Sequence, residues 1–216
     1  GSTVLHVVCS LLLIRWLRQW HLAGDDVQYL VVWSFSAQWS SKDCQTYSSS
    51  ESRHCSSPGR EQNVEELRNN SRMTAWRRKS DIVPVIVGGD FNSPSHLDWT
   101  DKTRDLHGGW QVQWPATKIM QEMNFTDSFR ELYPDSDVEP GHTWSTVNKY
   151  NPEWDFTIPE PQDRIDFIFY QGKIKPVRSY LYSGSEPLKP IPHHKDNDYP
   201  SDHYALITEF DIEELM

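Results

Sequence analysis

The stretch VIVGGDFNSPSHLDWT, Val85 to Thr100, decides how the rest of the sequence is interpreted. Apolar residues run directly into two glycines, an aspartate and an asparagine, which is typical of a buried strand that ends in a tight loop. Gly88 and Gly89 allow backbone angles that other residues resist. The strand would therefore hold the carboxylate of Asp90 and the carboxamide of Asn92 at one point. One interpretation is an Asx-type turn that caps the strand end, and the other is a functional site.

The composition indicates a globular and strongly acidic chain. Its 216 residues are 37% hydrophobic and 12% aromatic, enough for one sizeable domain with its own core. The formal net charge of −10 repels phosphate backbones, which disfavours a passive nucleic-acid binder. An enzyme that meets a phosphate through a bound cation is still allowed. The three cysteines lack the paired spacing of a zinc site.

Residues 1–45 are apolar but poorly patterned, and we expect residues 1–63 to form an atypical N-terminal segment of uncertain fold, distinct from the family-like residues 64–216. The run Val4–Ile14 has the length of a signal-peptide core, but no basic residue precedes it, and a buried strand or helix is the alternative. Val27–Trp39 has room for one strand. Residues 46–62 are rich in serine and predict a loop or linker. No run approaches the roughly 20 apolar residues of a membrane span.

From residue 64 onward the pattern predicts helices and strands in a layered α/β fold with a mixed sheet. Val64–Lys79 has the spacing of an amphipathic helix. The unbroken apolar strand from Ile82 to Gly89 predicts a sheet that is covered on both faces. A second helix is expected at Ala116–Phe125, and further strands at His142–Thr146, Arg164–Gly172, Val177–Gly184 and His203–Ile212.

A carboxylate inside the strand that begins at Arg164 requires a partner. By alternation Asp166 shares one face of this strand with Ile168, whereas Phe167 lies on the opposite face. Burial of an unpaired carboxylate among apolar side chains is strongly unfavourable. An ion pair with Arg164 would be a purely structural solution, and a partner in a functional site is the alternative.

Polar groups also stand where a loop enters the last strand, at Asp202 and His203. Together with Asp90, Asn92 and Asp166 they match the needs of phosphate-ester hydrolysis. Carboxylate oxygens hold a hard cation such as Mg²⁺, and one carboxylate can orient and deprotonate an attacking water. A carboxamide, and an imidazole held by a buried carboxylate, can donate hydrogen bonds to the charge that develops on the phosphate.

Three motifs, GDFN at 89–92, RIDFI at 164–168 and SDH at 201–203, resemble the endonuclease/exonuclease/phosphatase superfamily. The resemblance covers roughly Val64 to Ile212. It implies a four-layer α/β sandwich with two central sheets and one site at their shared edge. It also implies a metal-dependent phosphoesterase, and a phosphodiesterase is one such type.

The resemblance implies a role for each of five residues. Asp90 would orient the attacking water, and Asn92 would contact the scissile phosphate. His203 would contact the phosphate oxygens, with Asp166 accepting the other ring proton of the imidazole. Asp202 would help to hold Mg²⁺, with Mn²⁺ or Ca²⁺ as alternative ions.

The first half of the sequence departs from the family pattern. The family normally carries an asparagine on its first strand and a metal-binding glutamate in a Gln-Glu pair, and neither pattern occurs in residues 1–63. We therefore expect the sandwich to be incomplete in its N-terminal half. The chain is either a phosphoesterase, impaired by the missing half, or a non-catalytic remnant that acts as a binding or regulatory module.

The sequence leaves several properties open. The substrate would be a phospholipid head group, a small phosphate ester or a nucleotide, and the acidic surface makes duplex DNA a poorer choice. Secretion is favoured slightly over other compartments, and the number of subunits is not fixed. We expect His96, Asp98 and Trp99 to belong to a packed loop rather than to border the substrate, and Trp144 to lie in the core.

Overall fold

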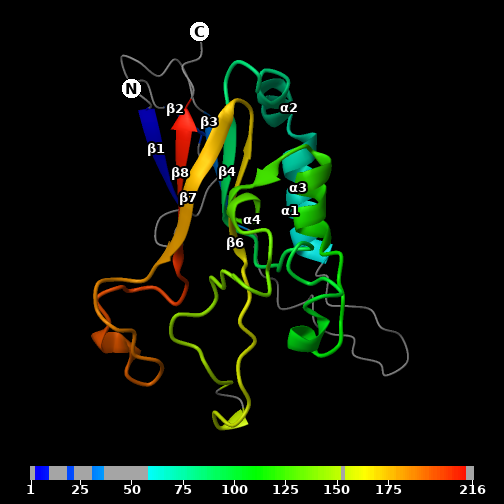
Figure 1. Cartoon of the computed structure of the whole chain (residues 1–216). Coiled ribbons are helices and arrows are strands. Elements are labelled where there is room, and N and C mark those ends of the chain that lie inside the picture. Colours follow the sequence, from blue (N-terminus) through cyan, green and yellow to red (C-terminus); the bar gives the residue numbers. More distant parts are fainter. Residues whose placement is uncertain (1–2, 10–18, 22–30, 37–57, 152–153, 213–216) are drawn as a thin grey trace.

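The computed structural model describes residues 3–9, 19–21, 31–36, 58–151 and 154–212, which form two sheets and a set of helices (Figure 1). The strands are β1 (Thr3–Cys9), β2 (Gln19–His21), β3 (Val31–Ser36), β4 (Val85–Asp90), β5 (Thr126–Asp127), β6 (Asp166–Gln171), β7 (Ile174–Tyr182) and β8 (Ala205–Ile212). The helices are α1 (Pro58–Asn69), α2 (Ser71–Arg77), α3 (Pro115–Glu122) and α4 (Ser128–Leu132), with short 3-10 helices η1 (Arg104–His107) and η3 (His194–Asp196). None of the helices in these ranges is long and apolar enough to cross a membrane.

The strand predicted from the opening motif, β4, is central to a five-stranded sheet of order β2-β3-β4-β6-β5. It pairs in parallel with β3 and antiparallel with β6, so the prediction of a mixed sheet is confirmed. Val85 and Val87 pack against the helices α1, α2 and α3, whereas Ile86 packs into the core between the two sheets. All three side chains are fully buried. The unbroken apolar run therefore reflects a strand covered on both faces, as predicted.

The three-stranded sheet has the order β1-β8-β7 and is antiparallel throughout. Strand β1 runs along β8 from the pair Thr3–Ile212 to the pair Cys9–Leu206. Of the alternatives for the run that begins at Val4, a strand is therefore correct up to Cys9, and residues 10–14 lie outside the described ranges. The core between the sheets consists of Val7, Cys9, Ile86, Phe129, Ile168, Tyr170, Ile174, Leu206 and Phe210.

One predicted helix, Val64–Lys79, is in fact two helices, α1 and α2, that meet at Asn70. Asn70 has an extended backbone, with φ −67° and ψ 123°, and its side chain accepts hydrogen bonds from the backbone N–H groups of Arg72 and Met73. An asparagine that caps the first turn of a new helix interrupts the preceding one. The apolar spacing was correct, but it could not reveal this cap.

The predicted strand His142–Thr146 is wrong. Within it Trp144 alone forms ladder contacts, and these are isolated bridges to Asp163 and to His203. A strand needs a continuous ladder to one neighbour, whereas this segment divides its backbone hydrogen bonds between two loops. The segment therefore ties the loop before β6 to the loop before β8.

The layers agree with a sandwich that is incomplete. In the described part of the chain, α1, α2 and α3 cover the outer face of the five-stranded sheet, and the three-stranded sheet has no helical layer of this kind on its far side (Figure 1). Strand β3 lies inside Val27–Trp39, as expected, and α1 begins within the serine-rich stretch 46–62. The division of the chain at residue 63 stays a prediction, since residues 10–18, 22–30 and 37–57 are not described.

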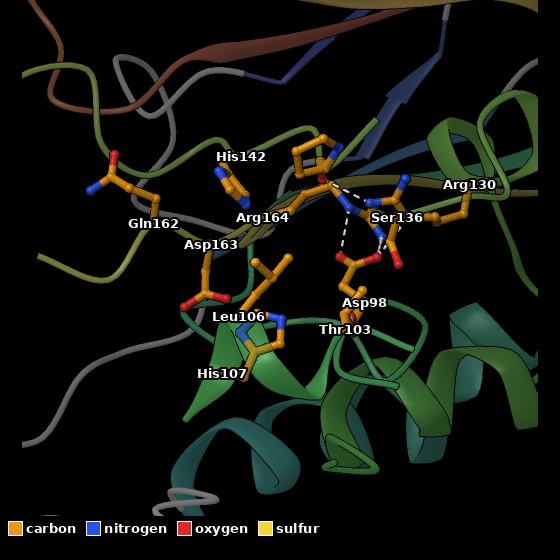
Figure 2. A pocket seen from close by; sticks show the side chains of 11 residues that line it. Asp98, Thr103, Leu106, His107, Arg130, Ser136, His142, Gln162, Asp163 and Arg164 are labelled. Carbon is orange, nitrogen blue, oxygen red and sulfur yellow. Dashed lines mark hydrogen bonds and ion pairs between the residues drawn. The ribbon is translucent and has the colours of Figure 1, made fainter. Parts of the chain in front are cut away.

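A buried ion-pair network fastens the loop after β4 to the start of β6 (Figure 2). The fully buried Arg164 donates to Asp98 from Nε at 2.9 Å and from Nη2 at 3.1 Å, and to Asp127 from Nη1 at 2.7 Å. Arg130 donates from Nε to the same Asp98 carboxylate. The structural alternative for Asp166, an ion pair with Arg164, is therefore wrong, because the guanidinium is engaged by other carboxylates.

Replacing Asp98 by alanine should destabilise the fold by about 3–5 kcal/mol, because the buried Arg130 then loses its ion pair and the buried Arg164 keeps only the one with Asp127. The measurement is the free energy of unfolding in urea. Asp101→Ala is the matched control, since its carboxylate is 78% exposed and pairs with the exposed Arg104. That substitution should have little effect, and equal losses in the two variants would contradict the prediction.

Candidate active site

Asp90 is the last residue of β4, and its carboxylate is buried. The backbone N–H of Asn92 donates to Oδ1 at 2.7 Å, and the side-chain amide of Asn92 donates to Oδ2 at 2.7 Å. The turn closes because Asn92 has a φ of 46°, in the left-handed region that asparagine tolerates better than most residues. The Asx-type turn is therefore present, and it fixes the direction of the Asp90 carboxylate.

Asp166 is the first residue of β6 and lies directly opposite Asp90 in the antiparallel ladder. It is fully buried, and its Oδ2 is 2.9 Å from Nδ1 of His203, which donates to it. This is the contact that the family resemblance implied. The second oxygen, Oδ1, is buried and has no hydrogen-bond partner within the described residues. A buried acceptor without a donor favours a cation or an extra proton beside it.

The side chains of Asp90, Asp166 and His203 form one group, in which a ligand atom from each lies within 4.8 Å of the other two. All three residues are buried. Two carboxylates and one imidazole are a donor set that can hold a divalent cation. We call these three residues the central group.

Burial and charge set the protonation of the central group. The pKa of Asp90 is raised to about 7, chiefly by burial and further by repulsion from the charge of Asp166. Three groups oppose this rise: the backbone N–H of Asn92, His203 and Arg60. Burial would lower the pKa of His203, but its hydrogen bond to Asp166 and the charge of that carboxylate outweigh burial and raise it. A carboxylate that exchanges a proton near neutral pH therefore lies beside an imidazole that favours its charged form.

Asp202 does not join the central group, although the resemblance assigned it to the metal. Its side chain is exposed, while its backbone carbonyl accepts a hydrogen bond from Ser145 Oγ at 2.8 Å. Trp144, expected in the core, is partly exposed, and its ring meets the ring of His203 edge-on at a centroid distance of 4.8 Å. The loop before β8 thus places its imidazole in the group and its carboxylate outside it.

Sequence reasoning missed two residues beside the central group, Arg60 and Cys9. Arg60, near the start of α1, is buried and donates from Nε to the carbonyl oxygen of Asn92 at 2.9 Å. Its positive charge opposes the rise in the pKa of Asp90. The stretch PGRE at 58–61 carries a helix-start signal, a proline followed by an acidic residue, but the serine-rich sequence before it favoured a loop.

Cys9 ends β1 and is buried, and burial raises the pKa of its thiol, with the charges of Asp166 and Asp90 adding to the effect. The neutral thiol of Cys9 therefore lies near the two carboxylates. It belongs to the first strand, on which the family pattern led us to look for an asparagine. A single cysteine in an apolar run carries no sequence signal for such a position.

The loop that follows GDFN is packed, as predicted. The ring of His96 lies within hydrogen-bond distance of Thr117 Oγ1 at 2.8 Å and of the side chain of Gln121. The indole N–H of Trp99 donates to Asp163 Oδ1 at 2.8 Å. Because the His96 ring and the Trp99 indole already have internal partners, the loop serves the architecture of the site.

A cavity of about 250 Å³ lies beside the buried ion-pair network (Figure 2). Burial raises the pKa of Asp163 and lowers that of His142, and both side chains line the cavity. Asp163 and Arg164 lead directly into β6, so the cavity borders the strand that begins with Asp166 without including any member of the central group. The other lining residues are Asp98, Thr103, Leu106, His107, Arg130, Ser136, Pro140 and Gln162.

Two comparisons of the sequence identify its family and a relative. The sequence profile of the endonuclease/exonuclease/phosphatase family matches residues 5–203. An uncharacterised protein of Caenorhabditis elegans is 53% identical over 152 residues, which make up 70% of this chain and 48% of that protein. The chain therefore spans about half the length of this relative.

Solved structures share the fold. Truncated TDP2 of Caenorhabditis elegans aligns with a TM-score of 0.51 at 14% identity, over 97% of this chain and 66% of that one. Selenomethionine TDP2 of the same organism gives a TM-score of 0.51 at 13% identity, over 97% of this chain and 51% of the other. At this level of identity the similarity concerns the fold, and it supports the sandwich type predicted from the sequence.

The raised pKa of Asp90 predicts a pH-dependent cost to stability. The unfolded chain loses this proton near its ordinary pKa of 3.8, whereas the folded protein keeps it up to about 7. The stabilisation is therefore complete below about pH 4 and is lost as the pH rises to about 7, by roughly 2–4 kcal/mol. Asp90→Asn should lack this loss. Urea unfolding of both proteins in chelator, from pH 4 to pH 8, measures it, and parallel curves would contradict the prediction.

The contact between Asp166 and His203 predicts a shift that can be measured directly. NMR titration of the His203 ring should give a pKa above the ordinary value for histidine, because Asp166 stabilises the imidazolium. In Asp166→Asn the pKa should fall, since burial then acts without the compensating charge. The titrations of the remaining histidines are the internal control, and an unchanged His203 pKa would show that the pair is not formed in solution.

Proposed function

The chain belongs to the endonuclease/exonuclease/phosphatase family, and from this premise we propose that it is a divalent-metal-dependent hydrolase of phosphate esters. The observation that carries the proposal is the central group. Two carboxylates face each other in the β4–β6 ladder, one imidazole is their close counter-charge, and Asp166 Oδ1 has no partner within the described residues. A structural ion pair would not leave such an oxygen buried and unpaired.

The donor set of the central group suits a divalent ion. The unpaired Asp166 Oδ1 and the carboxylate of Asp90 offer oxygen, while His203 has its Nδ1 bound to Asp166. Oxygen ligands suit Mg²⁺, with Mn²⁺ and Ca²⁺ as alternative ions. A bound cation would polarise the phosphoryl oxygens and neutralise charge on the phosphate. The exposed Asp202 would take part only through a different side-chain conformation.

The residues of the site would each act on a defined atom. With a pKa of about 7, Asp90 can take the proton of an attacking water at neutral pH. Because Nδ1 of His203 is bound to Asp166, Nε2 is the ring nitrogen left to donate to a phosphate oxygen. Asn92 fixes Asp90 through two hydrogen bonds, and its carboxamide stands at the same turn for contact with the phosphate.

The alternative, a non-catalytic remnant that binds or regulates, is supported by two observations. The first strand contains no asparagine and ends in Cys9, and the Asp202 side chain lies outside the central group. Both would weaken metal binding. The substrate classes stay those expected from the sequence, phospholipid head groups, small phosphate esters and nucleotides, with duplex DNA disfavoured by the net charge of −10.

The test is hydrolysis of bis(p-nitrophenyl) phosphate and p-nitrophenyl phosphate with Mn²⁺, Mg²⁺ or Ca²⁺, and with chelator. Metal-dependent turnover should fall by roughly 100-fold or more in Asp90→Asn and in His203→Gln, since a positioned base or acid contributes about that much. Asp137→Asn, at an exposed carboxylate outside the site, is the control and should keep full activity.

Thermal denaturation with and without each ion separates the two proposals. A rise in melting temperature with Mn²⁺ that disappears in Asp166→Asn supports the metal site even if the test substrates are poor ones. A protein that is folded by circular dichroism, shows no turnover and gains no stability from any of the three ions would be a remnant.

A further inference from the structure

Four apolar side chains are exposed on the segment between Trp144 and β6. Their exposed fractions are 51% for Tyr150, 58% for Trp154, 48% for Phe156 and 44% for Ile158. We call these four residues the aromatic tip. Single exposed apolar residues are ordinary, but four within nine positions, three of them aromatic, form a patch that calls for a function.

The aromatic tip is held in a defined shape. Tyr150 and Pro159 form a bridge, and the backbone N–H of Asn151 donates to the carbonyl of Ile158 at 2.8 Å. Phe156 has a φ of 58°, a left-handed conformation that is strained for a bulky residue. The fold therefore accepts both backbone strain and exposed apolar area at this point, and such a combination is characteristic of functional segments.

The aromatic tip stands at the same end of the molecule as the central group. In Figure 1 the segment hangs below the ends of the sheets, at the end where β4 stops and where β6 and β8 begin. Asn148, two residues before Tyr150, donates its backbone N–H to Ser145 Oγ at 2.9 Å, and Ser145 follows Trp144, whose ring packs on His203. A surface that touched the tip would thus lie at the end of the molecule that holds the central group.

The charges around the tip limit what it can bind. Asp155 and Glu160 are acidic, while Lys149 is turned inward and donates to Gln162 Oε1 at 3.0 Å. Aromatic residues also stack on bases of single-stranded nucleic acid, but such sites need a basic groove that tracks the backbone. The described residues Asp155 and Glu160 place acidic side chains beside the tip instead, and the whole chain has a net charge of −10.

We propose that the aromatic tip docks on a lipid surface of zwitterionic head groups. Tryptophan, tyrosine and phenylalanine prefer the boundary between head groups and acyl chains, and a convex tip can enter it without a complementary groove. An anionic membrane would repel the acidic chain. Docking would bring the central group to phosphate esters at the surface. The binding itself does not depend on hydrolysis, so it can be tested even if the proposed activity fails.

The test is co-sedimentation of the full chain with phosphatidylcholine vesicles. The double variant Trp154→Ala/Phe156→Ala should lower the partition constant of the protein from water to the vesicles by roughly tenfold or more. Two large apolar side chains then no longer leave water on binding. The matched control is Ile82→Ala/Val177→Ala, which removes residues that are 70% and 49% exposed but lie away from the tip. The control should bind as the unchanged protein does, and circular dichroism should show that both variants are folded.

Two further readouts identify the kind of surface. Binding should persist when salt is raised, because it is apolar, and it should weaken when phosphatidylserine is added to the vesicles. Acyl-brominated lipid should quench the fluorescence of Trp154, seen as a difference between the unchanged protein and Trp154→Ala. The proposal is overturned if the chain does not bind at millimolar lipid, or if the two double variants bind equally. It is also overturned if the tip variant instead loses affinity for a single-stranded oligonucleotide or changes the oligomeric state.

Discussion

The guanidinium of Arg164 is the constraint on which the site depends. It is fully buried and shared between Asp98, in the loop after β4, and Asp127, which also accepts the backbone N–H groups of Phe129 and Arg130 at the start of α4. A buried guanidinium without its carboxylates is strongly unfavourable, so these three segments can only be buried together. Arg164 lies two residues before Asp166. The network therefore fixes the start of β6 relative to the loop that leaves Asp90.

The register of β4 and β6 places the two carboxylates of the central group opposite each other. Because Asp90 and Asp166 are directly opposed, the charge of Asp166 adds to the cost of ionising the buried Asp90. His203 relieves this cost through Asp166 Oδ2, and the Asn92 turn relieves it at Asp90. A slip of one residue would send one carboxylate to the other face of the sheet and abolish the pair. Rigid strands thus maintain a charge arrangement that flexible loops would relax.

Local patterns predicted the parts of this site that depend on local physics. The apolar run fixed β4 and its two covered faces, and the high cost of an unpaired carboxylate required a partner for Asp166. The partners of Arg164 could not be predicted, because Asp98 and Asp127 are 66 and 37 positions away. The position of the Asp202 side chain depends on backbone contacts between loops, and the cap at Asn70 depends on one side chain. The pattern of apolar residues carries neither kind of information.

The distribution of charge explains how such a site could meet a phosphate at all. The chain as a whole repels anions, so long-range attraction cannot guide a phosphate ester to the central group. The cationic groups beside the two carboxylates, His203 and Arg60, act over short distances and in a buried environment, where their charges are least screened. Recognition must then rest on contacts made after encounter. Apolar contact at the same end of the molecule is a physical means of prolonging that encounter, because it is insensitive to the sign of the net charge.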